Sequence, residues 1–223
     1  WGRLKAIPVV LITGTNGKTT TARLVARILQ EAGLGVGNSS TDGISVNGSM
    51  VDEGDWTGPG AARAVLRRPE VEVAVLETAR GGILRRGLGV ERCDAALVTN
   101  ISGDHLGEYG IYELGDMART KALVYDLVDD DGYRVVNIDD AHVRRIAEDL
   151  RGRKILTTLH GGEVLRDHVE SGGPAVYLEG DALFLADGLT THRLIEVGRM
   201  PMARDGCARY DIMNALGAVA LAW

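Results

Sequence analysis

Cysteine, aromatic residues and long apolar runs are all scarce in this chain of 223 residues. The two cysteines, Cys93 and Cys207, form no C-x-x-C pair, which argues against a disulfide framework or a zinc site and favours a reducing cytoplasm. No apolar stretch reaches the roughly 18 residues of a membrane span, and residues 1–12 lack the pattern of a signal peptide. We therefore expect a cytoplasmic protein that makes no use of a membrane.

Positive charge is also in short supply, because 25 lysine and arginine residues face 31 acidic residues and the net charge is -6. Nucleic-acid-binding domains normally carry a basic face, and anionic membranes attract basic segments, so neither partner is expected. The chain does contain 45% hydrophobic residues and 30 glycines. This composition is typical of a globular domain that has a real core and many turns.

Apolar runs alternate with helical patterns through the first two thirds of the chain. Val9–Thr13 predicts a buried strand, and Thr19–Ala32 predicts the helix that follows it. Strands that alternate with helices favour right-handed crossovers and a mostly parallel sheet. The fold class is therefore α/β, a mostly parallel sheet flanked by helices. Further strands are predicted at 71–76, 95–99 and 133–138, and further helices at 117–127, 141–150 and 210–223.

The pattern changes after about residue 155. Short strand-like pieces separated by glycine and aspartate follow one another, namely KILTTL, EVLRDHV, PAVYLEG, DALFLAD and THRLIEV. They predict antiparallel hairpins, so we expect a small antiparallel annex over about 155–200 within one domain that spans 1–223. The sequence stops inside the helical pattern NALGAVALAW. That pattern predicts a piece of a longer protein whose C-terminal domain is absent.

The turn after the first strand, GTNGKTT, carries the strongest chemical signal. A loop between a buried strand and a helix offers backbone N–H groups and the positive end of the helix dipole to an anion. Gly14 and Gly17 let the backbone approach a phosphate, Lys18 can neutralise it, and Thr19 can ligate magnesium. Because Ile12 stands where the common pattern G-x-x-x-x-G-K-[ST] has glycine, a tight turn with a capping threonine is the alternative. The candidate nucleotide-binding residues of this P-loop are Gly14, Thr15, Asn16, Gly17, Lys18, Thr19 and Thr20.

Two further polar residues follow predicted strands. Glu77 comes directly after VAVL, and His105 lies in TNISGDHLGEYG after the next strand. Ligands bind at the carboxyl ends of the strands in open parallel sheets, so an acid and a histidine at this edge suggest a metal cluster, with oxygen ligands favouring magnesium. A solvated glutamate and a surface histidine are the alternative. The segment between these strands, ARGGILRRGLG at 79–89, predicts a bare, basic loop.

Together these stretches resemble the central ATPase domain of the Mur ligase superfamily, whose phosphate loop is G-T-x-G-K-[ST] and lacks the early glycine. The sequence is most similar to the branch of cyanophycin synthetase. LETARGGILRRGLG is more specific than the loop, because peptidoglycan-building relatives carry a different sequence after that glutamate. The matching stretches are GTNGKTTT (14–21), TDGISV (41–46), GDWTGPGAA (54–62), VEVAVLETARGGILRRGLG (71–89), CDAALVTNISGDHLG (93–107) and DGYRVVNIDD (131–140).

The resemblance implies roles for the candidate catalytic and metal residues. Lys18 would hold the β- and γ-phosphates, Thr19 and Glu77 would ligate one magnesium ion, and His105 would ligate a second. Lys121 falls at the position of a lysine that carbon dioxide carbamylates in many relatives, which would make it an anionic metal ligand. An ordinary lysine on a helix surface is the alternative for Lys121.

The resemblance also implies an adenine site. Asn214, in YDIMNALGAVA, matches a helix asparagine that contacts adenine in relatives, but Tyr210 and Asp211 stand where many relatives have His-Asn. The stretch NIDD at 137–140 matches a recurrent N-x-D-D, for which a plain turn and helix N-cap is the alternative.

The reaction implied by the family is an ATP-dependent ligation. A substrate carboxylate takes the γ-phosphoryl group, giving an acyl phosphate, and an amine displaces phosphate to form an amide. In the cyanophycin branch, arginine would be joined to the β-carboxyl of an aspartate backbone. The expected partners are thus ATP, Mg2+, an acidic peptide or polymer, and an amino acid. Arg80, Arg85 and Arg86 are candidates for holding the acidic chain, with surface arginines as the alternative, and Thr57-Gly58-Pro59 is a candidate wall of its groove.

Two other functions are alternatives to this ligation. A peptidoglycan or polyglutamate ligase is disfavoured by ETARGGILRRGLG. A nucleotide-binding domain without turnover is disfavoured because Lys18, Thr19, Glu77 and His105 occur together. Branch members couple this domain to flanking domains, so we expect the isolated chain to bind Mg-ATP weakly and to ligate nothing by itself. The donor, the acceptor and the oligomeric state are open, with a homo-oligomer as one option.

Overall fold

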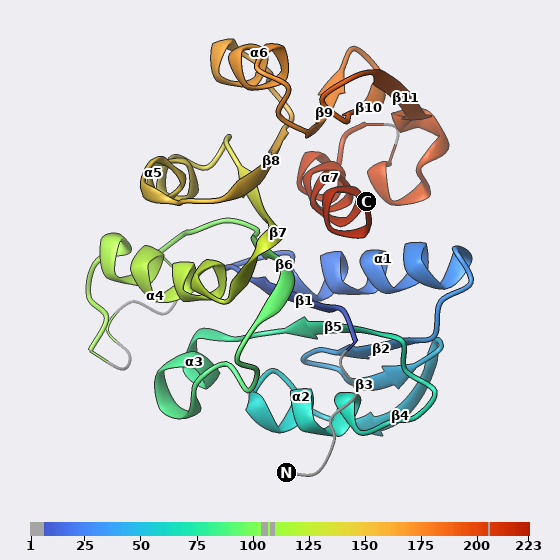
Figure 1. The fold of residues 1–223 in the computed structure, drawn as a ribbon, viewed down its shortest axis with the longest axis vertical. Coiled ribbons are helices and arrows are strands. Elements are labelled where there is room, and N and C mark those ends of the chain that lie inside the picture. The colour runs from blue at the N-terminus through green and yellow to red at the C-terminus, as the bar shows by residue number, and fades with distance from the viewer. Residues whose placement is uncertain (1–6, 104–106, 108–109, 205) are drawn as a thin grey trace.

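The computed structural model describes residues 7–103, 107, 110–204 and 206–223, and its centre is one mixed sheet (Figure 1). The strands are β1 (Val9–Thr13), β2 (Val36–Ser39), β3 (Gly43–Val46), β4 (Ser49–Glu53), β5 (Val73–Glu77), β6 (Cys93–Val98), β7 (Val128–Asn137), β8 (Arg153–Thr158), β9 (Ala175–Glu179), β10 (Ala182–Ala186) and β11 (Thr191–Glu196). Their order is β11-β10-β9-β8-β7-β6-β1-β5-β2-β3-β4.

The helices lie on the two faces of this sheet. They are α1 (Lys18–Glu31), α2 (Pro59–Leu66), α3 (Arg80–Arg86), α4 (Leu114–Asp126), α5 (Ala141–Asp149), α6 (Glu163–Glu170) and α7 (Arg209–Ala222), with two 3-10 turns at Val197–Arg199 and Pro201–Ala203. Helices α1 and α7 pack together on one face, whereas α2, α4 and α5 bury their apolar residues on the other. No helix in the described part of the chain is both long and apolar enough to cross a membrane.

The centre of the sheet is parallel, as predicted. Strand β1 pairs in parallel with β5 on one side and with β6 on the other, and parallel pairing continues outward to β2 and to β9. All five residues of β1 are buried, because helices cover both faces of a parallel strand. The α/β class is confirmed, and the carboxyl ends of β1, β5 and β6 meet at one edge of the sheet.

The predicted boundary of the antiparallel annex is too early. KILTTL forms β8, which is parallel to β7, and β9 is parallel to β8. EVLRDHV is helix α6 and not a strand, because two parallel strands need a crossover between them. Antiparallel pairing begins only at β9–β10–β11. A second antiparallel ribbon, β2–β3–β4, forms the opposite edge of the sheet and was not predicted.

The segment 79–89 is also not a bare loop. Residues Arg80–Arg86 form helix α3, in which Ile83 is buried, and Gly87 ends the helix with a φ of 77°. A loop was predicted because GGIL contains two glycines, and glycine has a low helix propensity. Packing of α3 against α4 compensates for that propensity.

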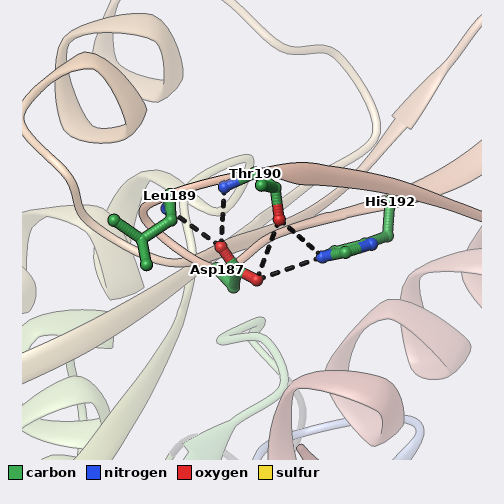
Figure 2. Close-up of polar contacts among 4 residues, drawn as sticks. All are labelled: Asp187, Leu189, Thr190 and His192. Carbon is green, nitrogen blue, oxygen red and sulfur yellow. Dashed lines mark hydrogen bonds and ion pairs between the residues drawn. The ribbon is translucent and has the colours of Figure 1, made fainter.

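The turn between β10 and β11 is held by one carboxylate (Figure 2). Asp187 Oδ1 accepts hydrogen bonds from the backbone N–H groups of Leu189 and Thr190, at 2.9 and 2.8 Å. Its Oδ2 lies 3.1 Å from Thr190 Oγ1 and 3.0 Å from His192 Nε2. These hydrogen bonds favour the ionised form and hold the pKa of Asp187 well below its usual range.

We expect Asp187→Ala to lower the melting temperature at pH 7, with a smaller difference at acid pH. A carboxylate whose pKa is lower in the folded chain contributes stability above its unfolded pKa, near 3.8, and loses that contribution as the pH falls below it. Thermal unfolding followed by circular dichroism between pH 7 and pH 2.5 measures this. Glu148→Ala, on the exposed side of α5, is the matched control. A deficit that stays constant down to pH 2.5 would contradict the assignment.

Candidate functional site

The P-loop connects β1 to α1 in a conformation that only glycine tolerates at two positions. Gly14 has a φ of 148° and Gly17 a φ of 82°. A Cβ atom on Gly14 would lie 1.8 Å from Thr99 Oγ1, and one on Gly17 would lie 2.1 Å from Asn214 Oδ1. The loop is thus pressed between the end of β6 and helix α7, and both glycines are needed for this close approach.

The residues after β6 hold the loop in place through hydrogen bonds. The backbone N–H of Thr15 donates to Asn100 O at 2.9 Å, and that of Asn16 donates to Asn100 Oδ1 at 3.0 Å. Thr99 Oγ1 donates to Asn16 O at 2.6 Å, and Ser102 N donates to Thr15 Oγ1 at 3.0 Å. The shape of the loop is therefore already set by its neighbours and needs no ligand to form.

The start of α1 faces the same edge without a capping side chain. Helix α1 begins at Lys18, and its N-cap residue Gly17 has no side chain that could accept from the first turn. The first N–H groups of a helix have no partner inside the helix and attract anions. Lys18 Nζ donates to Thr15 O at 3.0 Å, which keeps the ammonium group at the loop. The capping-threonine alternative fails, because Thr19 has a different partner.

That partner is Glu77, the last residue of β5. Thr19 Oγ1 donates to Glu77 Oε2 at 2.7 Å, and Thr41 Oγ1 lies 3.1 Å from Thr19 Oγ1. Glu77 is only 2% exposed, and its Oε1 atom has no hydrogen-bond partner within the described part of the chain. Burial raises the pKa of Glu77, opposed by the hydrogen bond from Thr19 and by the charge of Lys18. The solvated-glutamate alternative is therefore wrong.

Glu77 and Thr19 suit a hard divalent cation. A buried carboxylate oxygen that lacks a partner is costly, and a cation would supply both the missing contact and the missing charge. Magnesium in nucleotide sites is commonly held by one or two protein oxygens together with phosphate oxygens and water. Among residues 7–103, 107, 110–204 and 206–223, no group of three histidine, cysteine or acidic side chains forms a separate metal cluster. His105, predicted as the second ligand, lies outside the described residues.

Lys121 is a buried part of the site and not a surface lysine. It lies on α4, is 4% exposed, and its Nζ donates to Gly14 O at 2.7 Å. Burial lowers the pKa of Lys121 to about 7, with further contributions from the charges of Lys18 and Arg80. Near neutral pH a substantial fraction of this amine is therefore uncharged. Arg80 is also buried, with Nη1 placed 3.9 Å from Met117 Sδ, so it is not a surface arginine either.

Helix α7 supports the loop from the other side. Asn214 is 7% exposed, and its Oδ1 accepts from Thr21 Oγ1 at 3.4 Å. Tyr210 and Asp211 precede it by about one turn of the same helix, Tyr210 being 67% exposed and Asp211 half-buried. Asn214 therefore lies beside the P-loop, and its contact with adenine stays a prediction.

The stretch at 137–140 has a structural role. Asp140 caps α5 by accepting from His142 N and Val143 N, both at 2.9 Å, and its Oδ2 accepts from Ile101 N at 2.8 Å. Asp139 accepts from Leu159 N at 2.7 Å. The N-cap alternative is thus confirmed for Asp140, which also holds the segment after β6 through Ile101, whereas Asp139 holds the turn after β8.

The remaining candidates lie near the end of β5. Thr57 is buried, donates to Asp55 Oδ1 from both its N–H and its hydroxyl, and accepts from Ala79 N at 3.2 Å. Arg85 and Arg86 are exposed on α3. Their contact with a substrate, and that of the 57–59 loop, stays a prediction.

Three members of the site were not predicted from the sequence. Thr41, Thr99 and Asn100 organise Thr19 and the P-loop, yet their residue types are common in turns. Thr99 is the last residue of a predicted strand and Asn100 directly follows it, and that position was the available signal. Thr41 belongs to the β2–β3 connection, for which no strand was predicted.

The chain is similar to known ligases over most of its length. The family model of the Mur ligase middle domain matches residues 12–222. Cyanophycin synthetase from Crocosphaera subtropica is 43% identical over 213 residues, which are 95% of this chain and 24% of that protein. UDP-N-acetylmuramoyl-L-alanyl-D-glutamate--2,6-diaminopimelate ligase from Pseudomonas putida is 29% identical over 97% of this chain and 43% of its own length. The chain therefore spans about a quarter of the cyanophycin synthetases that it matches.

Solved structures show the same fold. A UDP-N-acetylmuramoyl-L-alanyl-D-glutamate--2,6-diaminopimelate ligase has a TM-score of 0.72 at 19% identity and covers 98% of this chain and 43% of its own. A bifunctional folylpolyglutamate synthase/dihydrofolate synthase with Mn, AMPPNP and L-glutamate bound has a TM-score of 0.65 at 21% identity, over 98% of this chain and 54% of its own. This chain belongs to the Mur ligase middle domain family.

Proposed function

We propose that this chain is the ATP-binding domain of an ATP-dependent amide ligase. The observation that carries the proposal is the buried Glu77 carboxylate, bonded to Thr19 at the mouth of a preformed P-loop, with one oxygen that lacks a partner in the described structure. Together with the first turn of α1 and Lys18, it offers oxygens to a cation and N–H groups to a triphosphate. The cofactors would be ATP and Mg2+, and the setting cytoplasmic.

The task of such a site is to bring two anions together. A carboxylate and a triphosphate repel each other strongly in a medium of low dielectric constant. Lys18 and the N–H groups of α1 would hold the β- and γ-phosphates and stabilise charge on the transferring oxygens. A magnesium ion at Thr19 and Glu77 would supply further positive charge. The γ-phosphoryl group would pass to the substrate carboxylate, and an amine would then displace phosphate from the acyl phosphate to form the amide.

For the substrate we propose a poly-aspartate-like acceptor and arginine as the added amino acid. This is supported by 43% identity to cyanophycin synthetases, against 29% to the diaminopimelate ligase of P. putida, and by the segment ETARGGILRRGLG. The alternatives are an acceptor of the peptidoglycan or polyglutamate type and a nucleotide-binding domain without turnover. Product formation by the complete ligase from β-aspartyl peptides, UDP-linked muramyl peptides or folates distinguishes the poly-aspartate acceptor from the peptidoglycan and polyglutamate types. Because the relatives are about four times longer, the isolated chain is expected to form no product alone.

Calorimetry of Mg-ATP binding tests the phosphate site. Lys18→Ala should weaken binding by roughly tenfold to a hundredfold, since one charge-assisted contact to phosphate is lost. Lys154→Ala is the matched control, because its Nζ donates to Ala147 O, in a hydrogen bond between α5 and β8. Equal affinity of the parent and Lys18→Ala would overturn the assignment of the loop.

Lys121 is proposed to carry a carbamate when carbon dioxide is present. A neutral amine keeps a lone pair for carbon dioxide even while one of its N–H groups donates to Gly14 O. Since the pKa of Lys121 is about 7, the neutral fraction rises through pH 7 and should exceed half by pH 8. A carbamate carbon resonance should therefore grow between pH 6 and pH 8 in NMR spectra with 13C-bicarbonate.

Two variants test whether the carbamate resonance comes from Lys121. Lys121→Arg should remove the resonance, whereas Lys154→Arg should leave it unchanged. A resonance that persists in Lys121→Arg, or none in the parent at pH 8, would contradict the carbamate.

A further inference from the structure

A groove runs along the side of α1 that faces away from α7. One wall is formed by Arg23, Ala26, Arg27 and Gln30, whose spacing of three and four residues places them on one face of the helix. The hollow they border has a volume of about 310 Å³. A second hollow of about 440 Å³ shares Arg27 and Gln30 and continues past the end of α1 to Leu34 and Asn47.

The floor of the groove is a row of three side chains, one from each of three strands. Asn38 of β2 pairs with Ser45 of β3, and Ser45 pairs with Met50 of β4, so all three side chains lie on one face of the sheet. All three line the groove. The neighbouring residues of β3, Ile44 and Val46, point to the opposite face and belong to the core under α2. Strand β3 therefore has an apolar face that packs under α2 and an opposite face, with Ser45, that borders the groove.

Asn38 is the feature that indicates a ligand. It is 5% exposed, and its Oδ1 atom has no hydrogen-bond partner among the residues that the structure describes. Buried polar atoms are normally paired, so this one calls for a donor from outside the described chain. The other side chains at the groove add hydroxyl and amide groups, from Ser40, Ser45, Gln30 and Asn47.

The charged side chains of the wall are available to an acidic ligand. Arg23 pairs with Asp42 and Arg27 with Glu31, but all four side chains are between 44% and 72% exposed. Exposed ion pairs of this kind contribute little to stability. A carboxylate of a ligand can therefore replace Asp42 or Glu31 at modest cost.

The groove also leads to the phosphate site. Arg23 is one turn after Thr19 on α1, and its partner Asp42 follows Thr41, whose hydroxyl contacts Thr19. From Arg23 to Gln30 the helix rises about 10 Å, the length of roughly three extended peptide residues. A chain lying in the groove would thus run directly away from the reaction centre.

We propose that this groove binds an extended segment of the acidic, peptide-like acceptor, with its carboxylates at Arg23 and Arg27 and an N–H donor at Asn38. This inference rests on the proposed function for the identity of the polymer. The groove would retain the growing chain between successive additions at the phosphate site.

Fluorescence anisotropy tests the proposal on the 223-residue chain. The probes are fluorescein-labelled hexa-aspartate and the same peptide carrying arginine on each β-carboxyl group. Arg27→Glu should weaken binding of hexa-aspartate about fivefold to tenfold, because it replaces an attraction by a repulsion. It should weaken binding of the arginine-carrying peptide less, because each added arginine brings a guanidinium beside its carboxylate. Ser45→Tyr should weaken binding at least as much by filling the hollow. Arg145→Glu, the same charge change on the exposed side of α5, should have no effect.

Mg-ATP affinity, measured by calorimetry on the same variants, separates this proposal from the proposed function. Unchanged ATP affinity in Arg27→Glu together with weaker peptide binding supports the groove. Equal peptide affinity in the parent, Arg27→Glu and Ser45→Tyr, with folding verified by circular dichroism, overturns it and leaves the ATP site untouched. A dimer of the parent that Arg27→Glu dissociates in sedimentation would also overturn it, because a second copy would then occupy the groove.

Discussion

Replacement of Glu77 by glutamine is expected to stabilise the chain without ligands and to abolish the benefit of magnesium for ATP binding. Glutamine keeps an oxygen that can accept from Thr19 Oγ1, so the hydrogen bond at 2.7 Å can persist. What disappears is a negative charge on a side chain that is 2% exposed. Removal of an incompletely compensated buried charge should raise the free energy of unfolding by about 1 to 2 kcal/mol.

The stability gain of Glu77→Gln should depend on pH. Burial raises the pKa of Glu77 above 4.5, so the folded chain binds this proton more tightly than the unfolded chain. The stability of the parent therefore falls as the pH rises from about 4.5 through the raised pKa, and the deficit is complete above it. Thermal unfolding should show equal melting temperatures for parent and variant near pH 4 and a variant higher by about 2 to 8 °C at pH 8.

The functional loss is measured in parallel. In calorimetry, magnesium should strengthen ATP binding to the parent, whereas ATP affinity of Glu77→Gln should be nearly the same with and without magnesium. We expect the difference at saturating magnesium to reach about a hundredfold, since both the charge and one cation ligand are lost. Glu148→Gln on α5 is the control. A variant that is destabilised at pH 8, or that retains the full magnesium effect, would contradict the assigned role.

Replacement of Gly14 by alanine is expected to have the largest effect on stability. The added Cβ would lie 1.8 Å from Thr99 Oγ1 and 3.0 Å from the backbone nitrogen of Thr99, at a φ of 148°. A backbone neighbour cannot move aside cheaply, so β1 and the end of β6 must separate. We expect a loss of about 3 kcal/mol or more in urea unfolding and no measurable ATP binding.

Two controls separate the clash from backbone strain. Gly54→Ala also places alanine at a positive φ, 116°, but no atom lies within 4 Å of its added Cβ, so it should lose only about 1 to 2 kcal/mol. Thr99→Ala should destabilise the parent, because Asn16 O loses a donor, yet partly rescue Gly14→Ala by removing the nearest atom. Equal losses for Gly14→Ala and Gly54→Ala, without rescue, would show that the contact is not as tight as described.

Local signals were sufficient for the central strands and for the phosphate loop. Val9–Thr13 and the helix after it were placed correctly, because a parallel strand covered on both faces must be continuously apolar. Glu77 was found because it ends such a strand. A sequence pattern can predict these features because they depend on residues that are close together in the chain.

The prediction of helices and strands failed where contacts between distant segments determine the local structure. EVLRDHV has an apolar spacing too short to distinguish a helix from a strand, and the parallel pairing of β8 with β9 selects the helix. The ribbon β2–β3–β4 was missed because its strands are only four or five residues long and contain glycine, asparagine, serine and acidic residues. Its strand character depends on pairing with β5 and not on its own composition.

The sequence by itself determined the α/β class, the strand–loop–helix unit at GTNGKTT and the residues proposed to bind a phosphate and a cation. Only the tertiary structure decided their chemical state. Lys121 becomes a buried amine with a pKa of about 7 because α4 places it against Gly14 O beside two other cations. Glu77 keeps an oxygen without a described partner because β5 ends inside the protein. Burial and proximity arise from contacts between segments that are far apart in the chain, so residue type alone does not predict them.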